Sequence, residues 1–265
     1  MRRLLTPPIA ERLALLLLVV LSLLAFLLAP PIAQPQQYHG LADQRALTLS
    51  GFVLPNAADV LTSFLFTVVG GAGLLHTHRA RSVQRRALAL FFAALVLTGF
   101  GSAWYHLSPN DQSLVWDRLP MTAAFAGAVG AVAAERRGPQ AGIRWLLGWL
   151  LLGLVSIAVW VTTGDLRLYG LAQFGGFAVL LLWLRLPAVA GAVRLPWGLL
   201  LGAYAVAKGF EMLDREVWVV TGGMVAGHAL KHVVVALGVV PLVWALSRRL
   251  DPVGHGSSIR DAHKR

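Results

Sequence analysis

The chain has 265 residues, of which 57% are hydrophobic and only 13% are charged, and its mean hydropathy is +0.68. This balance lies outside that of soluble globular domains and indicates an integral membrane protein. The absence of cysteine excludes a thiolate nucleophile, a cysteine-based metal site and a disulfide scaffold, so any metal must be held by histidine, carboxylate or water.

Eight stretches approach the roughly 20 apolar residues that a membrane-spanning helix needs. The first follows a basic N-terminus and resembles a signal peptide, but its apolar run is long for one, which favours a retained helix. The stretches are 13–33, 57–75, 87–107, 117–134, 145–163, 168–184, 197–213 and 218–246. Short connections with turn-forming residues join them, so adjacent helices should be antiparallel neighbours. The predicted fold is an all-α polytopic membrane bundle with eight spans.

Basic residues concentrate in every second connection, beginning with the N-terminus and ending with the C-terminal tail. Because cytoplasmic loops retain an excess of Lys and Arg, both termini are predicted to be cytoplasmic. The net charge of +11 is then explained by topology and by anionic lipid headgroups, not by nucleic acid. The chain divides into an N-terminal helix (1–34), a membrane core (35–247) and a basic tail (248–265) that we expect to be disordered.

Five polar side chains fall in or beside these apolar stretches, where an ionisable group indicates a functional site. Ser102 and His106 lie one helical turn apart near the outer end of the third stretch, and Asp117 opens the fourth. His228 and His232 share one face of the last stretch, two to three turns from its outer end. Two imidazoles one turn apart commonly offer two ligands to one metal. Three histidines in all would leave the fourth position of a zinc ion open for water.

Structural interpretations compete with each of these roles. A lone histidine in a membrane helix often bonds a neighbouring helix, Asp117 suits the start of a helix as a cap, and Ser102 could serve packing alone. Haem or quinone binding fits less well than zinc, since a carboxylate accompanies the three histidines. We also expect Lys208 to pair with Glu211 one turn away, and Lys231 to snorkel or to meet an acidic neighbour.

The ordered motifs resemble those of the CREST superfamily of membrane hydrolases, whose best-known members are the alkaline ceramidases. The similar segments are Ser102-Ala-Trp-Tyr-His106, Asp117-Arg-Leu-Pro-Met121 and Gly227-His228-Ala-Leu-Lys-His232. The resemblance covers about residues 57–246. It implies a seven-helix core, to which the first span is an addition, and zinc held by the three histidines.

Two departures from the family pattern limit what the resemblance implies. No acidic, calcium-binding segment like that of the alkaline ceramidases precedes the second span, so the resemblance does not extend to calcium regulation. Many ceramidases have an acidic residue where this chain has Arg118, which bears on headgroup recognition. The fold and the chemistry therefore transfer better than the substrate does.

The expected function is a zinc-dependent intramembrane lipid amide hydrolase of ceramidase type. Water activated by zinc would attack the amide carbonyl, Asp117 would orient the water or carry its proton, and Ser102 would donate a hydrogen bond to the oxyanion. A lipid ester is an alternative substrate, and a zinc-stabilised lipid receptor with little turnover is the alternative function. The expected location is a bacterial inner membrane, with the site toward the outer, periplasmic leaflet. The oligomeric state stays open.

Overall fold

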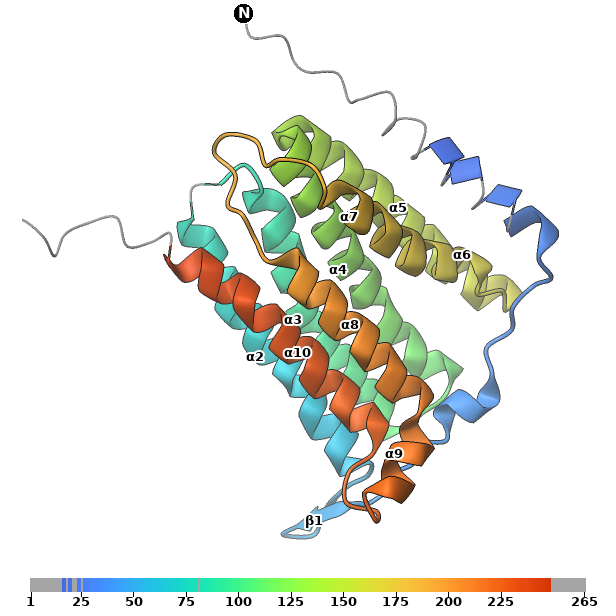
Figure 1. Cartoon of the computed structure of the whole chain (residues 1–265). Coiled ribbons are helices and arrows are strands. Elements are labelled where there is room, and N and C mark those ends of the chain that lie inside the picture. The colour runs from blue at the N-terminus through green and yellow to red at the C-terminus, as the bar shows by residue number, and fades with distance from the viewer. Residues whose placement is uncertain (1–15, 18, 21–22, 25, 81, 249–265) are drawn as a thin grey trace, which may run out of the picture.

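The computed structural model describes residues 16–17, 19–20, 23–24, 26–80 and 82–248. The structure is 76% helical with almost no strand, which confirms the all-α class. Its helices lie side by side in one elongated bundle (Figure 1). The predicted first span at 13–33 lies partly, and the tail at 248–265 almost wholly, outside the described residues.

Four helices are long and apolar enough to cross a membrane by length and composition. They are α2 (Ala57–Arg79), α3 (Arg85–Leu107), α5 (Pro139–Thr163) and α10 (Gly227–Ser247). Their outward side chains are apolar as well, as Leu97, Leu151 and Leu237 show by being at least 60% exposed. Helices that are apolar on every face suit a lipid environment. The helices of the described residues thus indicate a membrane protein.

The remaining elements complete the bundle and one of its ends. A continuous helical run consists of α6 (Arg167–Gly170), the π-helix η2 (Leu171–Gly175) and α7 (Gly176–Trp183). The other helices are the 3₁₀ turn η1 (Gln36–His39), α4 (Asp111–Arg137), α8 (Trp197–Met212) and α9 (Asp214–Val220). Strands β1 (Leu47–Leu49) and β2 (Phe52–Leu54) form an antiparallel hairpin. The hairpin and α9 lie at the same end of the molecule (Figure 1).

The predicted last span, 218–246, begins too early, because the chain breaks between α9 and α10 and the apolar helix begins at Gly227. Residues 221–226 are not helical, and Gly222 and Gly223 have φ values of +63° and +77°. Such values suit glycine and end a right-handed helix. The apolar side chains on both sides of the break concealed it, since hydropathy alone does not distinguish a helix from a turn in the membrane interface.

Packing places α3 between α2 and α4, and α10 between α2 and α8. The α7 helix packs on α4, whereas α8 packs mainly on α10. These contacts bring the end of α3 and the start of α10, which are far apart in the sequence, to the same end of the bundle (Figure 1).

A buried polar network joins the helices near the far end of α4. Glu135 is fully buried, and its Oε2 accepts hydrogen bonds of 3.0 Å from Gln84 Nε2 and from the Trp197 indole. Arg136 Nη2 lies 3.0 Å from its other oxygen. Gln84 also binds the backbone of Val193 in the connection between α7 and α8. One carboxylate therefore ties α3, α4 and α8 together.

The chain that leads from the N-terminus is fastened to the connection after α5. Ile32 N donates a 3.2 Å hydrogen bond to Asp165 Oδ1, and Leu166 N donates a 2.8 Å bond to the Ile32 carbonyl. Arg167 reaches the carbonyl of Phe26 and pairs with Asp165 at 2.8 Å. The hydrogen bond from the Arg167 guanidinium lowers the pKa of the Asp165 carboxyl to about 2.

Candidate metal centre

Three buried histidines form the centre of the site. His106 lies in the last turn of α3, and His228 and His232 lie in the first two turns of α10. Their ligand nitrogens all lie within 4.8 Å of one another. None of the three side chains is more than 3% exposed. The structure thus brings together the three histidines that the sequence singled out.

The ring nitrogens of this cluster lack the partners that buried imidazoles need. Both ring nitrogens of His106 and Nε2 of His228 make no hydrogen bond within the described residues. His232 Nδ1 lies 3.0 Å from the Thr62 hydroxyl, which leaves its Nε2 available as a ligand. Buried polar groups are nearly always satisfied, and neutral imidazole suits transition metals. The cluster could therefore hold a metal ion.

Contacts with α8 and α9 fix the start of α10. Asp214 Oδ1 accepts a 2.7 Å hydrogen bond from His228 N and so satisfies a donor at the helix start. A Cβ on Gly227 would lie 2.2 Å from the Phe210 carbonyl oxygen, so glycine is required for this approach. We predicted that the histidine pair lies two to three turns inside the last span. Because α10 begins at Gly227, the pair instead lies at the start of the helix.

Ser102 and Asp117 lie next to the histidines, on α3 and α4. They are 2% and 6% exposed, and both side chains line the same cavity. Ser63 Oγ on α2 lies 3.1 Å from Ser102 Oγ. A Cβ on Gly101 would lie 2.0 Å from the Trp116 carbonyl oxygen, so this glycine allows α3 and α4 to approach. This close approach places the Ser102 hydroxyl near the Asp117 side chain.

Asp117 does not cap α4, contrary to one of the interpretations of the sequence. The helix begins at Asp111, and Asn110 is its N-cap. Asn110 accepts a hydrogen bond from Ser113 N, while the Ser113 hydroxyl accepts one from Asn110 N, which completes a capping box. The side chain of Asp117 is therefore not used at a helix end.

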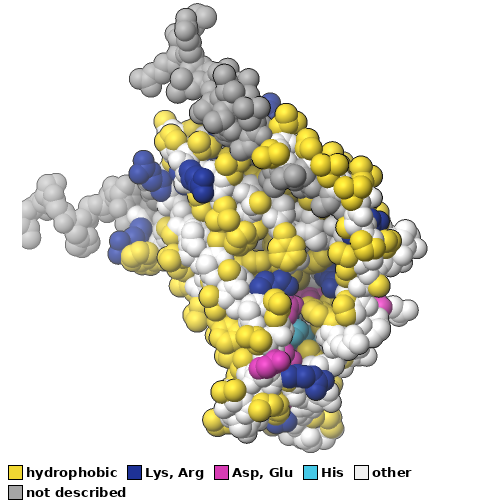
Figure 2. Space-filling view, turned by 45° about the vertical axis from the view of Figure 1, so that its right-hand side comes forward, with side chains coloured by type: hydrophobic (Ala, Val, Ile, Leu, Met, Phe, Trp, Pro, Cys, Tyr) yellow, Lys and Arg dark blue, Asp and Glu magenta, His cyan; other side chains and the backbone are white. Residues whose placement is uncertain are grey.

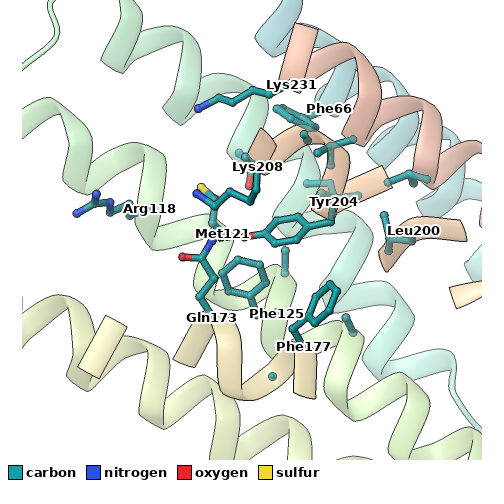
Figure 3. Close-up of a pocket in the computed structure, with 18 of the residues that line it drawn as sticks. Phe66, Arg118, Met121, Phe125, Gln173, Phe177, Leu200, Tyr204, Lys208 and Lys231 are labelled. Atoms are coloured by element: carbon teal, nitrogen blue, oxygen red, sulfur yellow. Dashed lines mark hydrogen bonds between the residues drawn. The ribbon is translucent and has the colours of Figure 1, made fainter. Parts of the chain in front are cut away.

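A cavity of about 210 Å³, lined by His232, extends into the bundle, and Figure 3 shows side chains that line it. One end is lined by Ser102, Asp117 and His232. The other end is apolar and is lined by side chains that include Phe177, Leu180, Leu200 and Val239. In the space-filling view a histidine is visible in a hollow bordered by basic and acidic side chains (Figure 2). The arrangement places polar chemistry at the head of an apolar chamber.

Charged groups surround the polar end of the cavity. Glu211 on α8 pairs with Lys208 and, at 3.1 Å, with Lys231 on α10, which confirms the expected pairing. The Tyr38 hydroxyl from η1 donates a 2.6 Å hydrogen bond to the same carboxylate. The Tyr38 ring meets the His228 ring edge-on, with centroids 6.3 Å apart. Thus η1 covers the histidine cluster from the side of the N-terminal chain.

Several residues of the site carried no signal that sequence reasoning could use. Thr62 is one of several hydroxyl residues in an apolar helix, and only its contact with His232 reveals its place in the site. His39 Nδ1 lies 3.0 Å from the Tyr105 hydroxyl, and its Nε2 lies 3.0 Å from Asp111. These contacts join segments that are distant in the sequence.

Comparison with known proteins identifies no relative. No family model matches the chain, and neither a curated protein nor a solved structure matches it. The resemblance to the CREST superfamily therefore rests on the three sequence motifs alone.

Proposed function

We propose that this protein is a zinc-dependent hydrolase that cleaves the amide bond of a membrane lipid. One observation carries the proposal: three buried imidazoles with unsatisfied nitrogens lie beside Asp117 and Ser102, at the head of an apolar cavity. Three protein ligands with further polar groups nearby are typical of catalytic zinc sites, in which the fourth position is open. A purely structural site would have a closed shell of four.

The residues around the histidines have distinct tasks in such a reaction. Zinc held by His106, His228 and His232 would supply Lewis acidity toward water and the amide carbonyl. Asp117 accepts a proton from the attacking water and delivers it to the leaving nitrogen. Ser102 donates a hydrogen bond to the oxygen that becomes negative. A C–O bond forms, the C–N bond breaks, and the products are a carboxylic acid and an amine.

The surroundings of the site favour a lipid substrate. Side chains near it that would face water in a soluble protein are strongly exposed and apolar: Met212 is 82%, Val220 is 86% and Met224 is 71% exposed. Exposed apolar patches of this kind mark membrane contact. The apolar end of the cavity offers a place for an acyl chain, and its carbonyl would then lie near His232.

We also propose a family, a number of membrane spans and an orientation for the chain. The chain is a member of the CREST superfamily, with seven core helices between residues 35 and 247 and one additional N-terminal span. Both termini face the cytoplasm, and the metal centre lies in the outer leaflet of a bacterial inner membrane. The alternation of basic connections supports this orientation. A reporter fused to the C-terminus should be cytoplasmic, and one inserted at Asp111 should be periplasmic.

Metal analysis and a lipid panel test the enzymatic role together. Protein purified in detergent should contain close to one zinc, and His228→Ala with His232→Ala should remove it. Asp117→Asn should keep zinc but lower amide hydrolysis by about 10²- to 10⁴-fold. Ser102→Ala should cost about 10²- to 10³-fold. Asp111→Asn is the matched control, since Asp111 lies on the same helix with a half-exposed carboxylate.

Two results would count against the proposal. Zinc retained at full stoichiometry in the double histidine variant would remove the metal assignment. If the zinc-loaded protein cleaves no amide or ester lipid, and Asp117→Asn changes only lipid affinity or stability, the protein is a zinc-stabilised lipid receptor.

A further inference from the structure

Arg118 is a buried cation at the polar end of the cavity. Its side chain is 8% exposed and lines the cavity. The guanidinium lies over three aromatic rings, 4.5 Å from the centroid of Trp160, 4.9 Å from that of Tyr169 and 5.7 Å from that of Tyr38. Its Nη2 donates a 2.7 Å hydrogen bond to the Gln34 amide oxygen. Within the described residues, Arg118 forms no ion pair.

One nitrogen of this guanidinium is unsatisfied. Nη1 is buried and has no hydrogen-bond partner among the described residues. A buried donor without an acceptor is costly, and the cost is larger for a charged group. The aromatic rings hold the guanidinium in place and stabilise its charge, but they provide no acceptor in the plane of its N–H groups. Arg118 therefore presents a fixed, unused donor at the cavity.

Two lysines add further positive charge at the same end. Among the described residues, Lys208 and Lys231 form ion pairs with one carboxylate, that of Glu211, and Asp117 and Asp59 act on Lys231 without pairing with it. The Lys231 ammonium lies 5.9 Å from the Tyr38 ring, the same ring that Arg118 meets from within 6 Å. Figure 3 shows the charged ends of both lysines on the side of the cavity nearer Arg118, away from Leu200.

The side chains that line the cavity include more cations than carboxylates. Arg118, Lys208 and Lys231 line it together with Asp117 and Glu211, whereas the buried Asp59, which acts on Lys231, lies outside this lining. A metal ion on the histidines would increase the positive excess. Uncompensated charge in an apolar surrounding is strongly unfavourable, so a bound anion would relieve it. The neutral alcohol headgroup of a ceramide would leave this excess in place.

We propose that these cations form a subsite for an anionic oxygen group, a carboxylate or a phosphate, on the amine part of the amide lipid. This inference rests on the proposed amide hydrolysis. With the acyl chain in the apolar end and the carbonyl at the histidines, the amine part lies among the cations. Arg118 directly follows Asp117, and Lys231 directly precedes His232, so the subsite adjoins the groups that act on the amide.

The test compares amides that share one acyl chain and differ in charge. The probes are N-dodecanoylglycine, N-dodecanoylphosphoethanolamine and the neutral N-dodecanoylethanolamine. Affinities are measured by calorimetry in the Ser102→Ala background, which retains every charge of the site and slows turnover. We expect at least one anionic probe to bind about 10-fold or more tightly than the neutral one. Arg118→Gln should weaken anionic binding by about 10- to 100-fold, as expected for a hydrogen bond to a charged group.

A second variant and a control make the result specific. Lys208→Gln, whose side chain is about one third exposed, should also lower anion affinity and guards against misfolding of the Arg118 variant. Arg185→Gln removes an exposed cation outside the cavity and should leave all affinities unchanged. Neutral-probe affinity should stay within about 3-fold in every variant, since the lost contact is charge-specific.

The outcomes separate this inference from the proposed function. Equal affinity for neutral and anionic probes overturns the subsite, as does an equal loss for both kinds of probe in Arg118→Gln. Anion-selective binding that depends on Arg118, with no hydrolysis of any probe by the wild type, refutes the enzyme and leaves the subsite standing. A preference for phosphate over carboxylate, or the reverse, identifies the headgroup.

Discussion

Replacing Gly227 by alanine should weaken metal binding, although this residue is not a metal ligand. The added Cβ would lie 2.2 Å from the Phe210 carbonyl oxygen, whereas ordinary contacts begin at 3.4 Å. The Cα of Asp214, at 2.9 Å, is also too close. Both neighbours are backbone atoms and cannot rotate away, so the start of α10 must move by about 1.2 Å. His228 is the next residue and must move with it.

The size of the effect follows from how narrow a metal site is. Zinc–nitrogen distances are about 2.0–2.1 Å, with a tolerance of about 0.2 Å. The required displacement exceeds that tolerance several times over. Disturbing the groups that orient a ligand typically costs about 10- to 100-fold in metal affinity, and we expect a loss near the upper end for Gly227→Ala. The overpacking should also lower the free energy of unfolding by about 1–3 kcal/mol.

Competition with a chromogenic chelator in detergent measures the zinc affinity, and thermal unfolding reports whether the variant is folded. Gly209→Ala is the matched control, because it makes the same substitution on α8 where a Cβ meets nothing within 4 Å. The control should bind zinc as the wild type does. A folded Gly227→Ala protein with wild-type zinc affinity would refute the link between this helix contact and the metal centre.

Three further predictions concern the support of the site and the fold. Thr62→Val removes the hydroxyl that meets His232 and should lower zinc affinity by about 10- to 100-fold in the same competition assay; unchanged affinity would contradict its orienting role. Glu135→Ala leaves buried donors without an acceptor and should lower the free energy of unfolding by about 3–5 kcal/mol in a denaturant titration; a loss below about 1 kcal/mol would show that the network is dispensable. The pKa of the Asp165 carboxyl is about 2 in the folded protein, and it is about 3.9 in an unfolded chain. The ionised carboxylate therefore stabilises the fold fully above about pH 4, and this stabilisation is lost as the pH falls through 2. Hydrogen exchange at the Ile32 amide, corrected for its intrinsic rate, should become faster as the pH falls over that range. In Asp165→Ala it should already be fast at neutral pH. A rate that does not change with pH would argue against the attachment of Ile32 to Asp165.

The sequence predicted the helices well wherever apolar runs end at strong turn signals. Gly138 with Pro139, and Gly164 with its left-handed conformation, lie at helix boundaries as expected. The prediction failed at α9, where Trp218 and the apolar residues around it continue the hydrophobic run through a reversal of the chain. It also placed the start of α4 six residues late, because the polar first turn from Asp111 does not look like part of a span.

The residues of the candidate site also include some that the sequence reveals and others that only the tertiary packing reveals. Histidines one turn apart are visible as a pattern because the helix repeat fixes their geometry. The contacts of Thr62, Tyr38 and Arg118 join segments that are distant in sequence, and their burial follows from tertiary packing alone. Arg118 was visible only as a departure from a family motif, without any indication that three aromatic rings surround it.

The spacing of the three histidines along the chain has a consequence for biogenesis. His106 enters the membrane with α3, whereas His228 and His232 arrive only with α10, the last helix of the described chain. A nascent or truncated chain that lacks α10 has one imidazole of the three and cannot capture the ion. If the histidines hold a metal as proposed, loading would follow insertion of the final helix. The cellular supply of that metal would then act on a fully inserted protein.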